Sequence, residues 1–176
     1  MRFFKLIFLL TVIIGLIGVL STPALAFGKF KKELEKETGA VKLVREVMRG
    51  GYDVITTAEL KGLMDKGKKI LVVDTMPYEA SYKKNHIPMA KQFEFPIPEM
   101  KSWDKALTGG KTKAQFEALL GADKESPIVI YCGFVKCTRS HNGAMWAAKL
   151  GYKNVYRHSG GIFAWRGAGY PVEKVK

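Results

Sequence analysis

The chain has 176 residues, and 29 lysines and arginines against 16 acidic residues give it a formal net charge of +13. Without internal repeats or low-complexity linkers, this length supplies one ordinary domain with a single core. So basic a surface can attract small anions, an acidic partner or a membrane surface. No basic and aromatic residues interleave as in a nucleic-acid module, so we expect no nucleic-acid binding.

Residues 1–26 have the pattern of a secretory signal peptide. Arg2 and Lys5 precede an uncharged apolar core, residues 6–20, and the small-residue pattern ALA ends at Ala26. Cleavage after Ala26 predicts a periplasmic or secreted protein with no stable membrane insertion. The alternative is a retained N-terminal membrane anchor, although the apolar core is shorter than the roughly 20 residues that a membrane span needs.

Residues 27–51 predict a helical extension ahead of the domain proper. Six apolar residues recur at helical spacing, with Gly39 as a possible break and two glycines at the end: Phe30, Leu34, Val41, Val44, Val47 and Met48, followed by Gly50 and Gly51. The extension either packs across the domain or serves as a partner-binding arm, and we favour packing.

The next elements alternate between strands and helices. A short strand at residues 54–55 is followed by Thr56 and Glu59, a capping box that predicts a helix to about Lys66. Residues 70–73 read as a central buried strand that ends at Asp74. We expect Asp74 to be a structural residue whose carboxylate accepts backbone or loop hydrogen bonds, and not a catalytic base.

A less regular stretch follows. We expect a short helix at residues 77–83, with His86 as a turn residue, and then a turn-rich connection in which Trp103 either covers the site or belongs to the core. Thr112 and Gln115 form a second capping box, which predicts a helix to about Leu120.

Cys132 marks the candidate site. It follows the apolar strand predicted at residues 128–131, and a short loop leads from it into a helix that runs from about Ser140 to Leu150. Backbone N–H groups at a helix start favour an anion and lower the pKa of a nearby thiol. Lys136 and Arg139 add two cations, and His141 either tunes Cys132 or faces solvent.

After a last strand at residues 155–156 and a glycine turn, a short helix is predicted at residues 162–165. Strands alternating with helices require parallel crossovers, so the pattern predicts an open α/β sheet.

The order and spacing of several pieces resemble the rhodanese sulfurtransferases from about Val54 to Val172: VVDT at 72–75, HIPMA at 86–90, the strand and Cys132, LGYKNVY at 150–156, GGIFAW at 160–165 and GYPVE at 169–173. The resemblance implies an open, mainly parallel five-stranded sheet flanked by helices on both faces, within residues 52–176. It also implies that Cys132 is the catalytic carrier of a persulfide sulfur and that Ser140 supports the site. The loop residues would bind the substrate: Gly133, Phe134, Val135, Lys136, Cys137, Thr138 and Arg139.

The loop departs from the common family pattern because Cys137 occupies its sixth position. It looks like a periplasmic subset of the family with a second loop cysteine, which puts thiosulfate-to-cyanide activity in question. Cys137 is either a resolving cysteine or a loop-packing residue. A phosphatase loop has five residues between its cysteine and arginine, whereas six separate Cys132 from Arg139, so that interpretation is weak.

These patterns predict a sulfurtransferase that moves a sulfane sulfur from a small anion, such as thiosulfate or polysulfide, to a thiol or protein acceptor. The chemistry calls for no metal and no organic cofactor. Two alternatives stay open: a thiol and disulfide redox protein that uses both cysteines, and a non-enzymatic persulfide carrier or sensor.

Overall fold

The computed structural model describes the backbone of residues 22–175 and the side chains from residue 28 onward. The predicted signal peptide therefore lies outside the described residues, except that residues 22–26 open helix α2, Thr22–Gly50. None of the helices in this described part is long and apolar enough to cross a membrane.

The domain is built on a five-stranded sheet in which every neighbouring pair is parallel, in the order β1-β5-β4-β2-β3. The strands are β1 (Asp53–Ile55), β2 (Leu71–Asp74), β3 (Lys91–Gln92), β4 (Ile128–Tyr131) and β5 (Val155–His158). Asp74, Tyr131 and His158 stand in one row across β2, β4 and β5. These three strands therefore end together, at the edge where ligands of open α/β sheets gather.

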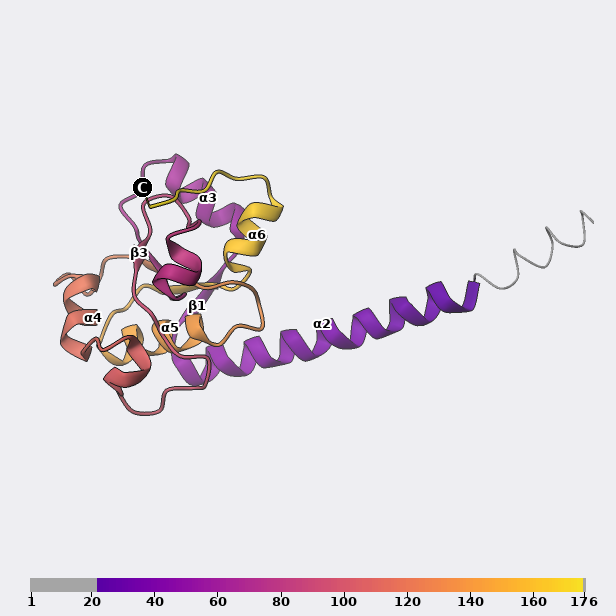
Figure 1. The fold of residues 1–176 in the computed structure, drawn as a ribbon, viewed down its shortest axis with the longest axis horizontal. Helices are drawn as coiled ribbons and strands as arrows, with labels where there is room; N and C mark the ends of the chain where they lie inside the picture. The colour runs from indigo at the N-terminus through magenta and orange to yellow at the C-terminus, as the bar shows by residue number, and fades with distance from the viewer. Residues whose placement is uncertain (1–21, 176) are drawn as a thin grey trace, which may run out of the picture. The chain divides into compact units, whose positions relative to one another are not determined.

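Helices cover both faces of the sheet (Figure 1), as the sequence predicted. Helices α4 (Lys113–Leu120) and α5 (Arg139–Lys149) pack on the face that Ile128 and Ile130 present. Helices α3 (Thr57–Asp65) and α6 (Gly161–Gly167) pack on the opposite face. Successive strand residues point to opposite faces, which is why β4 is buried throughout.

Two short helices complete the elements, a π-helical turn at Tyr78–Tyr82 and a 3₁₀ turn at Lys105–Thr108. Both predicted capping boxes are present, at Thr56 with Glu59 and at Thr112 with Gln115. Trp103 packs in a cluster of aromatic core residues and does not cover the site: Phe93, Phe95, Phe116 and Trp146.

Helix α2 runs through Gly39 without a break, so the possible interruption predicted there is wrong. A single glycine costs a helix only about 1 kcal/mol. The chain divides into two compact units, of which the first ends at Val41 and the second, Lys42–Lys176, contains the last two turns of α2. Within this second unit Glu46 is buried and Val47 packs against the core, so the end of the predicted extension does pack on the domain.

Candidate active site

Residues 132–138 form the loop between β4 and α5, at the carboxyl edge of the sheet. The first turn of α6 lies against the beginning of this loop. The N–H of Ile162 donates to the carbonyl of Cys132 over 2.9 Å, and the N–H of Phe163 donates to the carbonyl of Gly133 over 3.0 Å. Two helix starts therefore fix the loop, one at each end.

Cys132 is fully buried at the floor of the loop. Its Sγ lies 3.1 Å from Ser140 Oγ, 3.4 Å from the carbonyl oxygen of Cys137 and 3.9 Å from that of Phe134. A thiol can donate to a carbonyl, whereas a thiolate is repelled by it. Burial, together with a hydrogen bond to the Cys137 side chain, holds the pKa of Cys132 well above its ordinary value. The expectation of a lowered Cys132 pKa is therefore wrong for this arrangement.

The pKa of the second cysteine, Cys137, is shifted in the opposite direction. Its thiol accepts a hydrogen bond from the Cys132 side chain and others from the backbone N–H groups of Arg139 and Gly133, which lower the pKa of Cys137 to about 6 despite its burial. The two cysteines are free thiols. Of the backbone N–H groups that we expected to act on Cys132, that of Ser140 does so, whereas those of Gly133 and Arg139 act on Cys137.

The other predicted loop residues divide into exposed and tethered ones. Phe134, Val135 and Lys136 are exposed, and the Phe134 ring packs against Phe163 of α6. Arg139 is tethered: its guanidinium donates to the carbonyl of Phe95 and lies 3.6 Å from Glu94, which offsets part of its charge.

Thr138, the last residue of the loop, accepts a hydrogen bond of 3.2 Å from Lys42 of α2. Asp74 Oδ1 accepts a hydrogen bond of 2.8 Å from the backbone N–H of Met76. Burial raises the pKa of Asp74 to about 6.

His141 does not contact Cys132. Its ring is buried beside Tyr52, whose hydroxyl lies 2.8 Å from Nδ1, and burial lowers the pKa of His141 to about 4. A neutral histidine that faces Tyr52 cannot tune the thiol as a cation would.

Sequence reasoning missed the group behind the loop, which is the buried ion pair of Arg157 and Glu46. Arg157 of β5 donates to Glu46 over 2.5 Å, to Ser140 Oγ over 2.9 Å and to the carbonyl of Cys137 over 2.9 Å. One signal could have revealed it. An arginine in a strand next to the central strand needs a buried partner, because an isolated buried charge is too costly.

The comparisons with known proteins agree with this geometry. Residues 56–168 match the model of the rhodanese-like domain. The chain belongs to the rhodanese-like family.

Relatives of this rhodanese-like chain span plants and bacteria. It is 31% identical over 139 residues to rhodanese-like domain-containing protein 14, chloroplastic, of Arabidopsis thaliana, in a match covering 64% of this chain and 62% of the relative. A solved Bacillus halodurans structure is 26% identical, with a TM-score of 0.56 over 77% of this chain and 87% of that one. Thiosulfate sulfurtransferase from Pseudomonas aeruginosa is 20% identical, with a TM-score of 0.56 over 78% of this chain and 23% of that one, and shares the fold.

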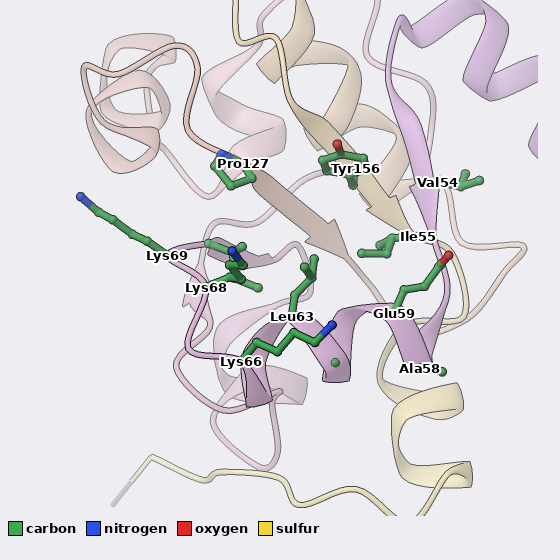
Figure 2. A pocket seen from close by; sticks show the side chains of 12 residues that line it. Val54, Ile55, Ala58, Glu59, Leu63, Lys66, Lys68, Lys69, Pro127 and Tyr156 are labelled. Carbon is green, nitrogen blue, oxygen red and sulfur yellow. The ribbon is translucent and has the colours of Figure 1, made fainter.

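A separate groove of about 770 Å³ lies between α3 and the strands of this rhodanese-like domain (Figure 2). Leu63 of α3 and Ile55 of β1 form part of its apolar wall, and Pro127 lies just before β4 begins. Cys132 follows the opposite end of β4, so the groove is remote from the loop. Its lining holds no cysteine or histidine, and within the described residues no cluster of three metal-ligating side chains occurs.

Proposed function

We propose that the protein transfers a sulfane sulfur from a small anionic donor, such as thiosulfate or polysulfide, to a thiol through a persulfide on Cys132. The observation that supports this most is the position of Cys132 at the start of the β4–α5 loop of a rhodanese-like domain, with its Sγ 3.1 Å from Ser140 Oγ. A second free cysteine, Cys137, lies in the same loop and can exchange a proton with it. The loop then contains both the nucleophile and a second ionisable thiol.

The first step would move a proton from Cys132 to Cys137 as the Cys132 sulfur bonds to the outer sulfur of thiosulfate. The sulfur–sulfur bond of the donor breaks, and its electron pair leaves on sulfite. An acceptor thiolate then attacks the outer sulfur of the persulfide, which releases Cys132 as a thiolate that recovers its proton from Cys137. Because Cys132 is fully buried, the exposed segment 134–136 has to move aside when the donor enters.

The presence of two free cysteines in one loop supports a second function, thiol and disulfide exchange. If Cys137 attacks the inner sulfur of the persulfide, hydrosulfide leaves and a Cys132–Cys137 disulfide forms, which an external thiol must reduce before the next cycle. A protein acceptor, or a carrier role without rapid turnover, is supported by the exposed apolar side chains beside the loop: Phe134, Val135 and Phe163.

The signal pattern supports export, and we propose that the mature protein acts in the periplasm or outside the cell. Sequencing the amino terminus of the protein recovered from the producing cells tests this, because cleavage after Ala26 leaves Phe27 first. An intact terminus at Met1 would favour the membrane-anchored alternative.

Single-cysteine variants test the transfer. With thiosulfate or polysulfide as donor and a small thiol as acceptor, Cys132→Ser should lose transfer completely, because no persulfide can form. Cys137→Ser is the matched control and should retain a reduced rate, since a serine hydroxyl accepts the proton poorly. Retained transfer in Cys132→Ser would overturn the proposal, and equal loss in both variants would favour the redox function.

A further inference from the structure

Arg157 of β5 donates hydrogen bonds to three residues near Cys132: Val135, Cys137 and Ser140. It is fully buried in β5, beside Ile130 of β4. Its Nε donates to Ser140 Oγ over 2.9 Å, while Nη2 donates to the carbonyls of Cys137 over 2.9 Å and Val135 over 3.2 Å. One guanidinium therefore holds the loop and the first turn of α5 together.

The hydrogen-bond roles at Ser140 follow from this contact. Arginine is only a donor, so Ser140 Oγ accepts from Arg157 and keeps its own hydrogen for another partner. Cys132 Sγ lies 3.1 Å from the same oxygen. Once Cys132 is a thiolate or a persulfide anion it can only accept, and the Ser140 hydroxyl then donates to it. Hydrogen bonds to charged acceptors are the stronger kind.

The hydrogen bond from Arg157 to the carbonyl of Cys137 also favours a negative charge on Cys132. The carbonyl oxygen of Cys137 lies 3.4 Å from Cys132 Sγ and disfavours a negative charge there. Since Arg157 donates to this carbonyl, it offsets part of that repulsion.

Arg157 is itself held by the end of α2, within the unit Lys42–Lys176. Its Nη1 donates to Glu46 over 2.5 Å, and Glu46 is also paired with Lys42, which reaches Thr138 at the end of the loop. The second half of the loop is thus tied to one carboxylate on α2 through Arg157 and Lys42.

We infer that Arg157 is a positioning residue for Cys132. By occupying Ser140 Oγ as a donor, it directs the serine hydroxyl at the reacting sulfur, and Glu46 of α2 keeps it in place. The inference rests on the proposed role of Cys132. The other charged or titratable groups around the loop come from every element packed against it: Cys137 and Lys136 within the loop, Asp74 at the end of β2, His158 at the end of β5, Arg139 in the first turn of α5 and Lys42 of α2.

The test is the pH dependence of the iodoacetamide alkylation rate of Cys132 in a Cys137→Ser background, where it is the one cysteine of the sequence left. Ser140→Ala should lower the thiolate fraction at a fixed pH about tenfold, a shift of about one pKa unit. Ser140→Thr keeps the hydroxyl and should restore most of the loss. Arg157→Gln should shift the profile in the same direction as Ser140→Ala, and the two changes together should shift it little further.

Arg45→Gln, at an exposed position of α2, removes the same charge and should leave the profile unchanged. If Arg157→Gln fails to fold, Arg157→Lys replaces it. A lysine amine cannot reach Ser140 and both carbonyls at once, as the planar guanidinium of arginine does. The pH profile of Cys132 alkylation should therefore also shift in Arg157→Lys. An unchanged profile in a folded Arg157 variant, or full additivity with Ser140→Ala, would overturn the inference. Alkylation needs no sulfur donor, so a failure of sulfur transfer alone would reject the proposed function and leave this inference standing.

Discussion

Gly161 lies so close to the carbonyl oxygen of Cys132 that no side chain fits between them. A Cβ at Gly161 would overlap that oxygen and would lie 2.7 Å from the carbonyl carbon and oxygen of Gly133. The backbone of Gly161 also has a φ of +59°, in the left-handed region that glycine adopts most easily. This close approach allows the start of α6 to bind the carbonyls of the loop.

We therefore expect Gly161→Ala to lower the free energy of unfolding by at least about 2 kcal/mol, because it combines backbone strain with a steric clash. Urea unfolding followed by circular dichroism measures the change. Gly167→Ala, in the last position of α6 with open space around its Cβ, is the matched control and should change stability by no more than about 1 kcal/mol. Equal stability of the two variants would contradict the account of α6.

Reactivity should separate the two cysteines. Because hydrogen bonds from Cys132 and two backbone N–H groups lower the pKa of Cys137 to about 6, Cys137 should be alkylated first, with a rate that rises around pH 6. Cys132→Ala removes a donor and should move that midpoint upward. Cys132→Ser keeps a donor and should move it less. Faster alkylation of Cys132 than of Cys137 in the reduced protein would show that the thiolate is assigned to the wrong sulfur.

Stability should fall as the pH drops from 6.5 toward 4. His141 and His158 are buried, which lowers the pKa of each to about 4 from 6.5, so in this window the unfolded chain binds two more protons than the folded one. Asp74 acts in the opposite direction up to pH 6, since burial raises its pKa to about 6 from 3.8 and the folded state then binds one more proton. Between pH 6 and pH 4 the net difference is 2 − 1 = 1 proton.

A net difference of one proton is worth at most about 1.4 kcal/mol per pH unit, with the folded state less stable at the lower pH. Urea unfolding at intervals between pH 4 and 7 measures this slope. His141→Gln should flatten it, because one of the two protonating histidines is gone. A stability that rises on acidification over this range would show that the burial of these histidines is described wrongly.

The sequence predicted those parts of the fold that local patterns specify. The apolar run 128–131 became the buried central strand, and the pairs Thr56 with Glu59 and Thr112 with Gln115 became capping boxes, because both depend on residues near in sequence. The position of Cys132 after the central strand likewise follows from local order.

The internal structure of the site could not be predicted, because it depends on contacts distant in the chain. Arg157 and Glu46 are 111 positions apart in the sequence. Taken singly, neither residue indicates more than a charged side chain on a strand or a helix. The backbone N–H groups of Gly133 and Arg139 act on Cys137 and that of Ser140 acts on Cys132, a division that the spacing of the residues does not reveal. Trp103 could equally have covered the site, and only packing places it in the core.

The central claim is that Cys132 carries the transferred sulfur, and peptide mapping tests it most directly. The reduced protein is exposed to thiosulfate or polysulfide, blocked with an alkylating reagent and digested with trypsin, which cleaves after Lys136 and so separates the two cysteines. We predict one added sulfur on the peptide that contains Cys132 and none on the peptide that begins at Cys137. Added sulfur on Cys137 alone, or a direct disulfide between the two peptides with no persulfide at any time, would contradict the account.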